Sequence, residues 1–111
     1  MIGESQRPVP TGRETTRMAT HELKSWPSQF QAMWTGLKRA EFRRDDRGYQ
    51  VGDLLELREW DPSQRQYTGF RLTARVMHLV RGPEFEVPAG FVVLSIEVLG
   101  ARVAGPGAGS E

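Results

Sequence analysis

The sequence predicts a mainly β, α+β domain in which a small sheet curls into a barrel with one main helix at its flank. Three observations support this. Five segments have the alternating or continuous apolar pattern of strands, one segment has a helical period, and turn residues separate the later strands. A chain of 111 residues supports one modest core. Consecutive strands joined by loops favour antiparallel pairing, and short chains of this kind often form small barrels.

The domain is predicted to begin with a strand and a short helix. Residues 21–26 alternate polar and apolar side chains. Pro27 then suits the first turn of a helix, where its missing N–H is tolerated. Apolar side chains follow at spacings of three, four and seven residues, on one helical face that we expect to pack in the core: Phe30, Met33, Trp34 and Leu37. Gly36 is expected to end the helix with a positive φ.

Four further strands are predicted, over residues 40–43, 54–60, 70–80 and 91–98. The pattern of 54–60 leaves open which face is buried, because Leu55 and Leu57 lie on one face and Leu54 and Trp60 on the other. The apolar run that starts at Phe91 favours a central position for the last strand. The longest strand has one predicted inward face, which carries Phe70, Leu72, Ala74, Val76, His78 and Val80.

The composition predicts one domain, residues 21–99, between two disordered tails. Residues 1–20 lack periodicity, and residues 100–111 are rich in Gly and Ala. No apolar run is long enough to span a bilayer, and no secretory signal is visible, so we expect a cytoplasmic protein. The absence of cysteine excludes disulfides and Cys-based zinc sites. The two histidines, His21 and His78, lack a ligand spacing, so we expect neither a metal nor another cofactor.

The charge of the chain is informative by location. The formal net charge is +1, but residues 38–47 contain five cations and three acids. A basic corner between a helix and a strand suits an anionic ligand such as a phosphate backbone. An acid among these cations either holds them in place or contacts a polar group of the ligand. The cations are Lys38, Arg39, Arg43, Arg44 and Arg47, and the acids are Glu41, Asp45 and Asp46.

Residues 36–43, Gly-Leu-Lys-Arg-Ala-Glu-Phe-Arg, match the pattern Gly-x-Lys-x-x-Glu-x-Arg. This pattern resembles the signature of the ASCH domains, relatives of the PUA-type RNA-binding barrels. Further segments resemble a small ASCH-related family of bacteria and phages, over residues 20 to 99: His21–Lys24, Val51–Asp53, Arg58–Asp61 and Tyr67–Gly69. The resemblance implies a PUA-like β-barrel whose cleft beside the first helix accepts RNA, a nucleotide or a modified nucleoside.

The resemblance implies that Lys38, Glu41 and Arg43 face this cleft, with Arg39 and Arg44 beside them. Lys38 suits a phosphate or carbonyl oxygen, and Arg43 suits a phosphate or a base edge. Glu41 either accepts from an exocyclic amine or pairs with the cations. A plain surface ion pair between Glu41 and Arg43 is the alternative. Unpaired bases also need stacking surfaces, and the candidates at strand ends and loops are Trp26, Tyr49, Trp60 and Tyr67. Core or rim packing is the alternative for the two tryptophans.

Two other functions stay open. Some small ASCH proteins are amidohydrolases that act on acylated cytidine through the signature Lys, a nearby Thr and a later Glu on a helix. Lys38 matches, but Glu41 replaces the Thr, and the segment with Glu84 and Glu86 is too short for that helix. We therefore favour a binding module over an enzyme, with Lys38 and Glu41 as the catalytic candidates if it is one. The third function is a protein-interaction adaptor that uses strand edges. The sequence leaves the oligomeric state open.

Overall fold

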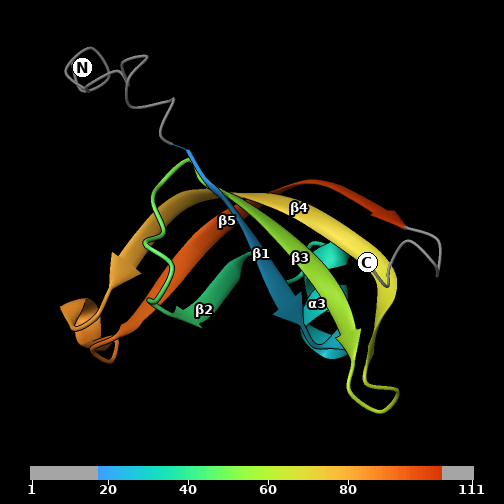
Figure 1. The fold of residues 1–111 in the computed structure, drawn as a ribbon. Helices are drawn as coiled ribbons and strands as arrows, with labels where there is room; N and C mark the ends of the chain where they lie inside the picture. Colours follow the sequence, from blue (N-terminus) through green and yellow to red (C-terminus); the bar gives the residue numbers. More distant parts are fainter. Residues whose placement is uncertain (1–17, 104–111) are drawn as a thin grey trace.

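A single curled sheet carries most of the chain (Figure 1). The computed structural model describes residues 18–103. In this part of the chain the sheet has five strands, the main helix is α3 (Pro27–Trp34), and a short 3-10 helix η1 (Glu84–Glu86) lies in a loop. The predicted mainly β fold with one main helix is confirmed. The strands are β1 (Thr20–Ser25), β2 (Ala40–Arg44), β3 (Leu54–Asp61), β4 (Gln66–Arg81) and β5 (Phe91–Val103).

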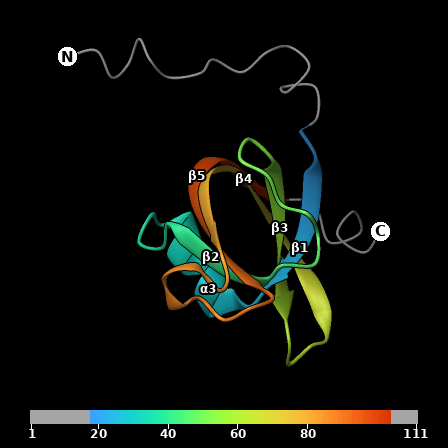
Figure 2. The same cartoon turned by 90° about the vertical axis from the view of Figure 1, so that its left-hand side faces the viewer.

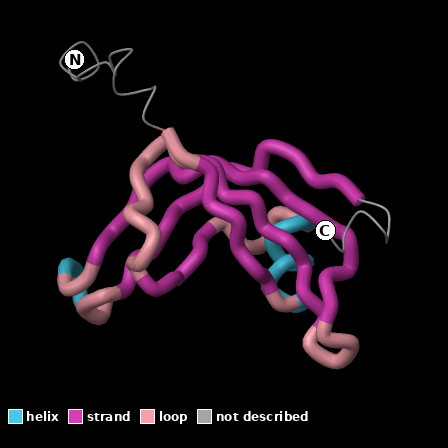
Figure 3. The backbone as a smooth tube through the Cα atoms, in the orientation of Figure 1, coloured by secondary structure: helices cyan, strands magenta, loops and turns pink. Residues whose placement is uncertain are grey.

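The strand order is β1-β3-β4-β5-β2, so the first two strands in the sequence form the two edges of the sheet. β3 pairs antiparallel with β4, and β4 with β5, as the short connections predict. β2 also pairs antiparallel with β5, although these two strands are far apart in the sequence. β1 instead runs parallel to β3, because the chain passes through α3, β2 and the loop of residues 45–53 before it returns to the start of β3 (Figure 3).

Two arginines connect the sheet edges, which approach each other as the sheet curls (Figure 2). Nη2 of Arg43 in β2 donates to the carbonyl oxygen of Lys24 in β1 at 2.9 Å. Nη1 of Arg47, just after β2, donates to the carbonyl oxygen of Glu22 at 3.0 Å. Side-chain hydrogen bonds to backbone therefore join β1 and β2 along this seam of the barrel.

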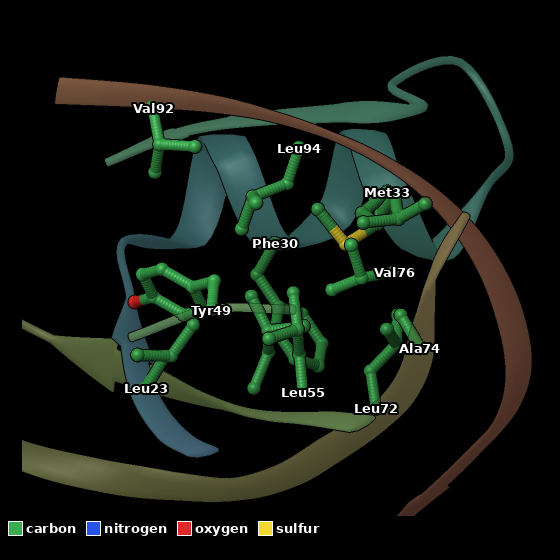
Figure 4. Close-up of a cluster of buried hydrophobic side chains, with 12 residues drawn as sticks. Leu23, Phe30, Met33, Tyr49, Leu55, Leu72, Ala74, Val76, Val92 and Leu94 are labelled. Atoms are coloured by element: carbon green, nitrogen blue, oxygen red, sulfur yellow. The ribbon is translucent and has the colours of Figure 1, made fainter. Parts of the chain in front are cut away.

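The interior contains apolar side chains from the sheet and from α3 (Figure 4). Phe30 and Met33 of α3 are buried, as predicted. Trp34 is 39% exposed and Leu37 is 85% exposed, so the predicted four-residue stripe enters the core only in part. The reason is that α3 ends at Trp34 and Gly36 turns the chain with a φ of +86°, which takes Leu37 off the helical face. The buried apolar residues are Leu23, Phe30, Met33, Tyr49, Leu55, Leu57, Leu72, Ala74, Val76, Val92, Leu94 and Ile96.

The structure decides which faces of β3 and β4 are inward. Leu55 and Leu57 of β3 are fully buried, which resolves the face that the pattern left open. In β4 the predicted inward face is confirmed for Leu72, Ala74 and Val76. It is wrong at Phe70, which is 38% exposed, and beyond Val76. The register shifts between Val76 and His78, so that Leu79 packs against the core and His78 is exposed. A bulge of one residue reverses the sides of all residues that follow it.

The last strand is longer than predicted. β5 continues through residues 100–103, which the composition assigns to a tail, because β4 offers partners as far as Phe70, opposite Val103. Thr20, which the prediction assigned to the N-terminal tail, is the first residue of β1 because it pairs with Leu54 of β3. Residues 1–17 and 104–111 of the predicted tails lie outside the described residues. Within residues 18–103, no helix has the length and apolar character needed to cross a membrane.

Candidate functional site

A cleft of about 600 Å³ opens between the end of β1, the start of α3 and the edge strand β2. β1 ends in front of Trp26, whose extended backbone leads into Pro27 at the first turn of α3. Trp26 therefore stands at the corner of the cleft and is 50% exposed. The lining contains four cations and one carboxylate. Its residues are Lys24, Ser25, Trp26, Gln29, Lys38, Ala40, Glu41, Phe42, Arg43, Arg44, Phe91 and Val93.

Glu41 is the buried centre of the basic residues in this cleft. Glu41 and Arg43 share a face of β2, and Lys38 precedes the strand by two residues. Oε2 of Glu41 accepts from Nζ of Lys38 at 3.1 Å, and Oε1 accepts from Nε of Arg43 at 3.0 Å. The Glu41 side chain is 4% exposed, whereas those of Lys38 and Arg43 are 23% and 24% exposed. A plain surface ion pair is therefore not what forms here: Glu41 holds two cations that remain accessible.

The guanidinium group of Arg43 is oriented from two sides. Its Nε donates to Glu41, and its Nη2 donates to the carbonyl oxygen of Lys24 at 2.9 Å. A guanidinium carries five N–H donors in a fixed plane, and these contacts use two of them. Both oxygens of Glu41 have partners, so its role in this geometry is to position Lys38 and Arg43 rather than to contact a ligand.

The cleft also contains two aromatic residues, Phe42 and Phe91, that the sequence did not indicate as site residues. Their rings stack at 5.2 Å between centroids with 11° between the planes. The guanidinium carbon of Arg44 lies 5.1 Å from the centre of the Phe91 ring. The pairing register explains the cluster, because Arg44 lies opposite Phe91 and Phe42 opposite Val93. Phe42 lies inside the signature, but only the register of β2 on β5 shows that it meets Phe91.

The sequence of this barrel matches a known family. The family model described as domain of unknown function DUF3850 matches residues 20–96. The chain belongs to this family. The matched region runs from β1 into β5 and includes all of the cleft residues given above.

The DUF3850 domain also resembles a phage protein. The "Uncharacterized 12.9 kDa protein in GpA 3'region" of Escherichia phage P2 is 45% identical over 56 residues, which are 50% of this chain and 50% of that protein. The aligned region therefore spans about half the length of this relative.

Four predicted binding residues of the DUF3850 domain lie outside the cleft. Tyr49 is 1% exposed in the core, with its ring 4.7 Å from that of His21, so it offers no stacking face. Trp60 and Tyr67 pack edge to face at 4.9 Å near the β3–β4 turn. Arg39 donates from Nε to the carbonyl oxygen of Gly36 at 3.3 Å. It lines another hollow, of about 220 Å³, which shares Lys38 with the cleft.

Cations cover the aromatic faces near the β3–β4 turn. Nζ of Lys24 lies 3.9 Å from the centre of the Trp60 ring, and the guanidinium carbon of Arg58 lies 3.9 Å from that of Tyr67. Trp60 therefore packs against neighbouring side chains, which was the alternative to stacking with a base. Trp26 differs, because it is half exposed and lines the cleft.

A second hollow, of about 410 Å³, lies beside His21 and Asp53. Asp53 is 1% exposed and accepts from Nε2 of His21 at 2.8 Å and from the backbone N–H groups of Ala19 and Gln50, each at 3.0 Å. Its carboxylate thus organises the turn in front of β3. Among residues 18–103, no group of three His, Cys, Asp or Glu side chains could hold a metal ion.

Neither candidate for the later Glu of the amidohydrolase alternative lies in the cleft. Glu84 and Glu86 belong to η1, in the loop between β4 and β5, and the lining of the cleft includes neither. Both are exposed. The charged side chains that line the cleft are suited to binding an anion, and its one carboxylate is paired with two cations.

Proposed function

We propose that this chain is an RNA- or nucleotide-binding module of the ASCH/PUA-like type that holds its ligand in the cleft beside α3. One observation carries the proposal: buried Glu41 holds Lys38 and Arg43 at 3.1 and 3.0 Å on the wall of a cleft of about 600 Å³. Small-molecule sites usually measure about 300–1,000 Å³. Cations that are fixed before binding lose little conformational entropy when an anion arrives.

The residues of the cleft divide by the part of a nucleotide that they suit. Lys38 is a point charge for a phosphate oxygen, and Arg43 is a planar fork for a phosphate or a base edge. Trp26 and the stacked pair of Phe42 and Phe91 provide aromatic surface for a base. The resemblance of residues 36–43 to the ASCH signature supports the same assignment. Because RNA and nucleotides are abundant in the cytoplasm, the proposal includes a cytoplasmic location.

The proposal predicts modest, salt-dependent affinity. The cleft has four cations, and two of them are paired with Glu41. For single-stranded nucleic acid, the slope of log K against log salt concentration is about −0.7 for each phosphate contact. Two to four contacts therefore give a slope of roughly −1.5 to −3.

The test removes the two cations without leaving Glu41 as an unpaired buried charge. Loss of one partner from a buried ion pair is strongly destabilising, so Lys38→Ala/Arg43→Ala alone would confuse binding with folding. The triple variant Lys38→Met/Glu41→Gln/Arg43→Gln is uncharged at all three positions. We expect it to unfold cooperatively and to bind a fluorescent ten-nucleotide single-stranded RNA at least about tenfold more weakly, because it loses two phosphate contacts.

Arg39→Gln is the matched control, because it lowers the net charge by the same amount at a residue that lines a different hollow. It should bind the RNA like the wild type. Fluorescence anisotropy at several salt concentrations gives both affinity and slope. A triple variant that is folded and retains the wild-type affinity and slope would show that the cleft is not the binding site.

A further inference from the structure

Ser25, the last residue of β1, lines the cleft and has a buried hydroxyl group. It is 3% exposed, and its Oγ makes no hydrogen bond with any of residues 18–103. The alternation of β1 turns its side chain inward together with His21 and Leu23. A buried polar group without a partner is uncommon in folded proteins and calls for a specific reason.

The other buried polar side chains near the cleft have partners. Glu59, opposite Ser25 in the β1–β3 register, accepts from Gln31 at 3.1 Å and from Thr68 at 2.8 Å. Glu41 holds its two cations. Within residues 18–103, one other buried side-chain nitrogen or oxygen lacks a hydrogen bond, Nε of Arg71. The guanidinium group of Arg71, however, forms ion pairs with Glu22 and Glu56. Ser25 therefore differs from these groups, and it lies where the cleft can admit a ligand.

The surroundings of Ser25 indicate what such a ligand contains. A hydroxyl group both donates and accepts, whereas Lys38 and Arg43 only donate. A phosphate is better matched to those two cations than to a neutral hydroxyl. Trp26, Phe42 and Phe91 line the same cleft and offer aromatic surface. A ring with polar atoms on its edge satisfies both features, and a nucleobase is a ring of this kind.

We propose that Oγ of Ser25 hydrogen-bonds the edge of an unstacked nucleobase in the cleft. This inference rests on the proposed function and narrows it: the ligand is recognised through one base, and Lys38 and Arg43 hold its phosphate. Ser25 then contributes to the choice of base, because a base edge that leaves the hydroxyl unpaired is bound less well.

The experiment compares wild type, Ser25→Ala and Ser28→Ala. Ser28 is an exposed residue of α3 outside the lining of the cleft, so it is a matched serine-to-alanine control. The probes are the four ribonucleoside 5'-monophosphates, ribose 5-phosphate as the base-free probe, and the ten-nucleotide RNA, with Kd measured by calorimetry. Loss of one neutral hydrogen bond should weaken the best monophosphate about tenfold in Ser25→Ala. Ribose 5-phosphate should bind equally to all three proteins.

Thermal unfolding of the free protein separates binding from a structural role. Ser25→Ala removes an unpaired buried hydroxyl, so its Tm should equal or exceed that of the wild type. A lower Tm would show that Ser25 supports the fold and would overturn the inference. So would an unchanged Kd for the monophosphates, or an equal loss of affinity for ribose 5-phosphate.

The two proposals fail in different ways. If the wild type binds the RNA and Ser25→Ala binds every probe equally well, the role of Ser25 is wrong and the cleft proposal stands. If the wild type binds none of the monophosphates or the RNA, both proposals are wrong.

Discussion

At the scale of single residues, burial determines which predicted side chains are able to meet a ligand. The sequence predicts Tyr49 as a loop aromatic available for stacking, whereas the structure buries it against His21. Its loop contains Gly48 and Gly52, both with positive φ, where backbone turns of this kind are unstrained. Burial has a chemical consequence: it raises the pKa of the Tyr49 phenol above 10.0, although Arg43 and Arg47 act in the opposite direction.

The Tyr49 phenol should make stability depend on alkaline pH. Its pKa is raised in the folded state, so above pH 10 the unfolded chain loses the proton first and binds fewer protons than the folded chain. The stabilisation is complete below pH 10 and declines above it, by at most about 1.4 kcal/mol per pH unit. Urea unfolding between pH 9 and pH 11 should show a steeper decline for the wild type than for Tyr49→Phe.

Tyr67→Phe is the control, because it changes the other of the two tyrosines. If Tyr67→Phe flattens the decline as much as Tyr49→Phe does, the dependence does not arise from burial of Tyr49.

At the scale of secondary structure elements, register has more influence than composition. β2 has five residues, and its pairing with β5 brings Phe42 and Arg44 to Phe91. β4 has sixteen residues, and its bulge before His78 sends Leu79 to the core in place of the predicted His78. A period of two is easy to see in a sequence, but an extra residue in a ladder is not.

The bulge predicts an order of mutational effects that differs from simple alternation. Leu79→Ala should lower the free energy of unfolding by about 1–2 kcal/mol, because this partly buried side chain packs on the core. His78→Ala should change it by less than about 0.5 kcal/mol, because His78 is exposed. Urea denaturation of the two variants measures both values. The reverse order would indicate that β4 alternates without a bulge.

At the scale of the whole molecule, the barrel is closed in two ways. Backbone ladders join the strands from β1 through β3, β4 and β5 to β2. Arg43 and Arg47 complete the circle with hydrogen bonds to the carbonyl groups of Lys24 and Glu22. The cleft opens at the Arg43 end of this seam, so the same arginine contributes to closure and to the candidate site.

A seam held by side chains should open locally. Arg47→Ala removes the bond to Glu22, and the net value of one hydrogen bond is about 0.5–1.5 kcal/mol. Amide hydrogen exchange in β1 should therefore accelerate by up to about tenfold, while the central strand β4 keeps its protection. Arg65→Ala, in the exposed β3–β4 turn, is the control and should leave both strands unchanged. Uniform acceleration in all strands would mean that Arg47 stabilises the molecule as a whole.

Local sequence patterns were sufficient to predict the secondary structure elements and the part of the candidate site in residues 38–43. Four of the five strands and the helix begin within one or two residues of their predicted starts, because periodicity, proline and glycine act over short distances. β4 starts earlier, at Gln66 instead of residue 70. Lys38, Glu41 and Arg43 lie within six residues of each other, so a short strand sufficed to bring them together.

The long-range contacts could be seen only in the folded protein. These are the parallel course of β1 beside β3, the contact of Phe42 with Phe91, the burial of Tyr49 and the unpaired hydroxyl of Ser25. The physical reason is that register and burial depend on which surfaces meet after the chain folds. A local sequence pattern does not predict which residues that are far apart in the sequence come into contact.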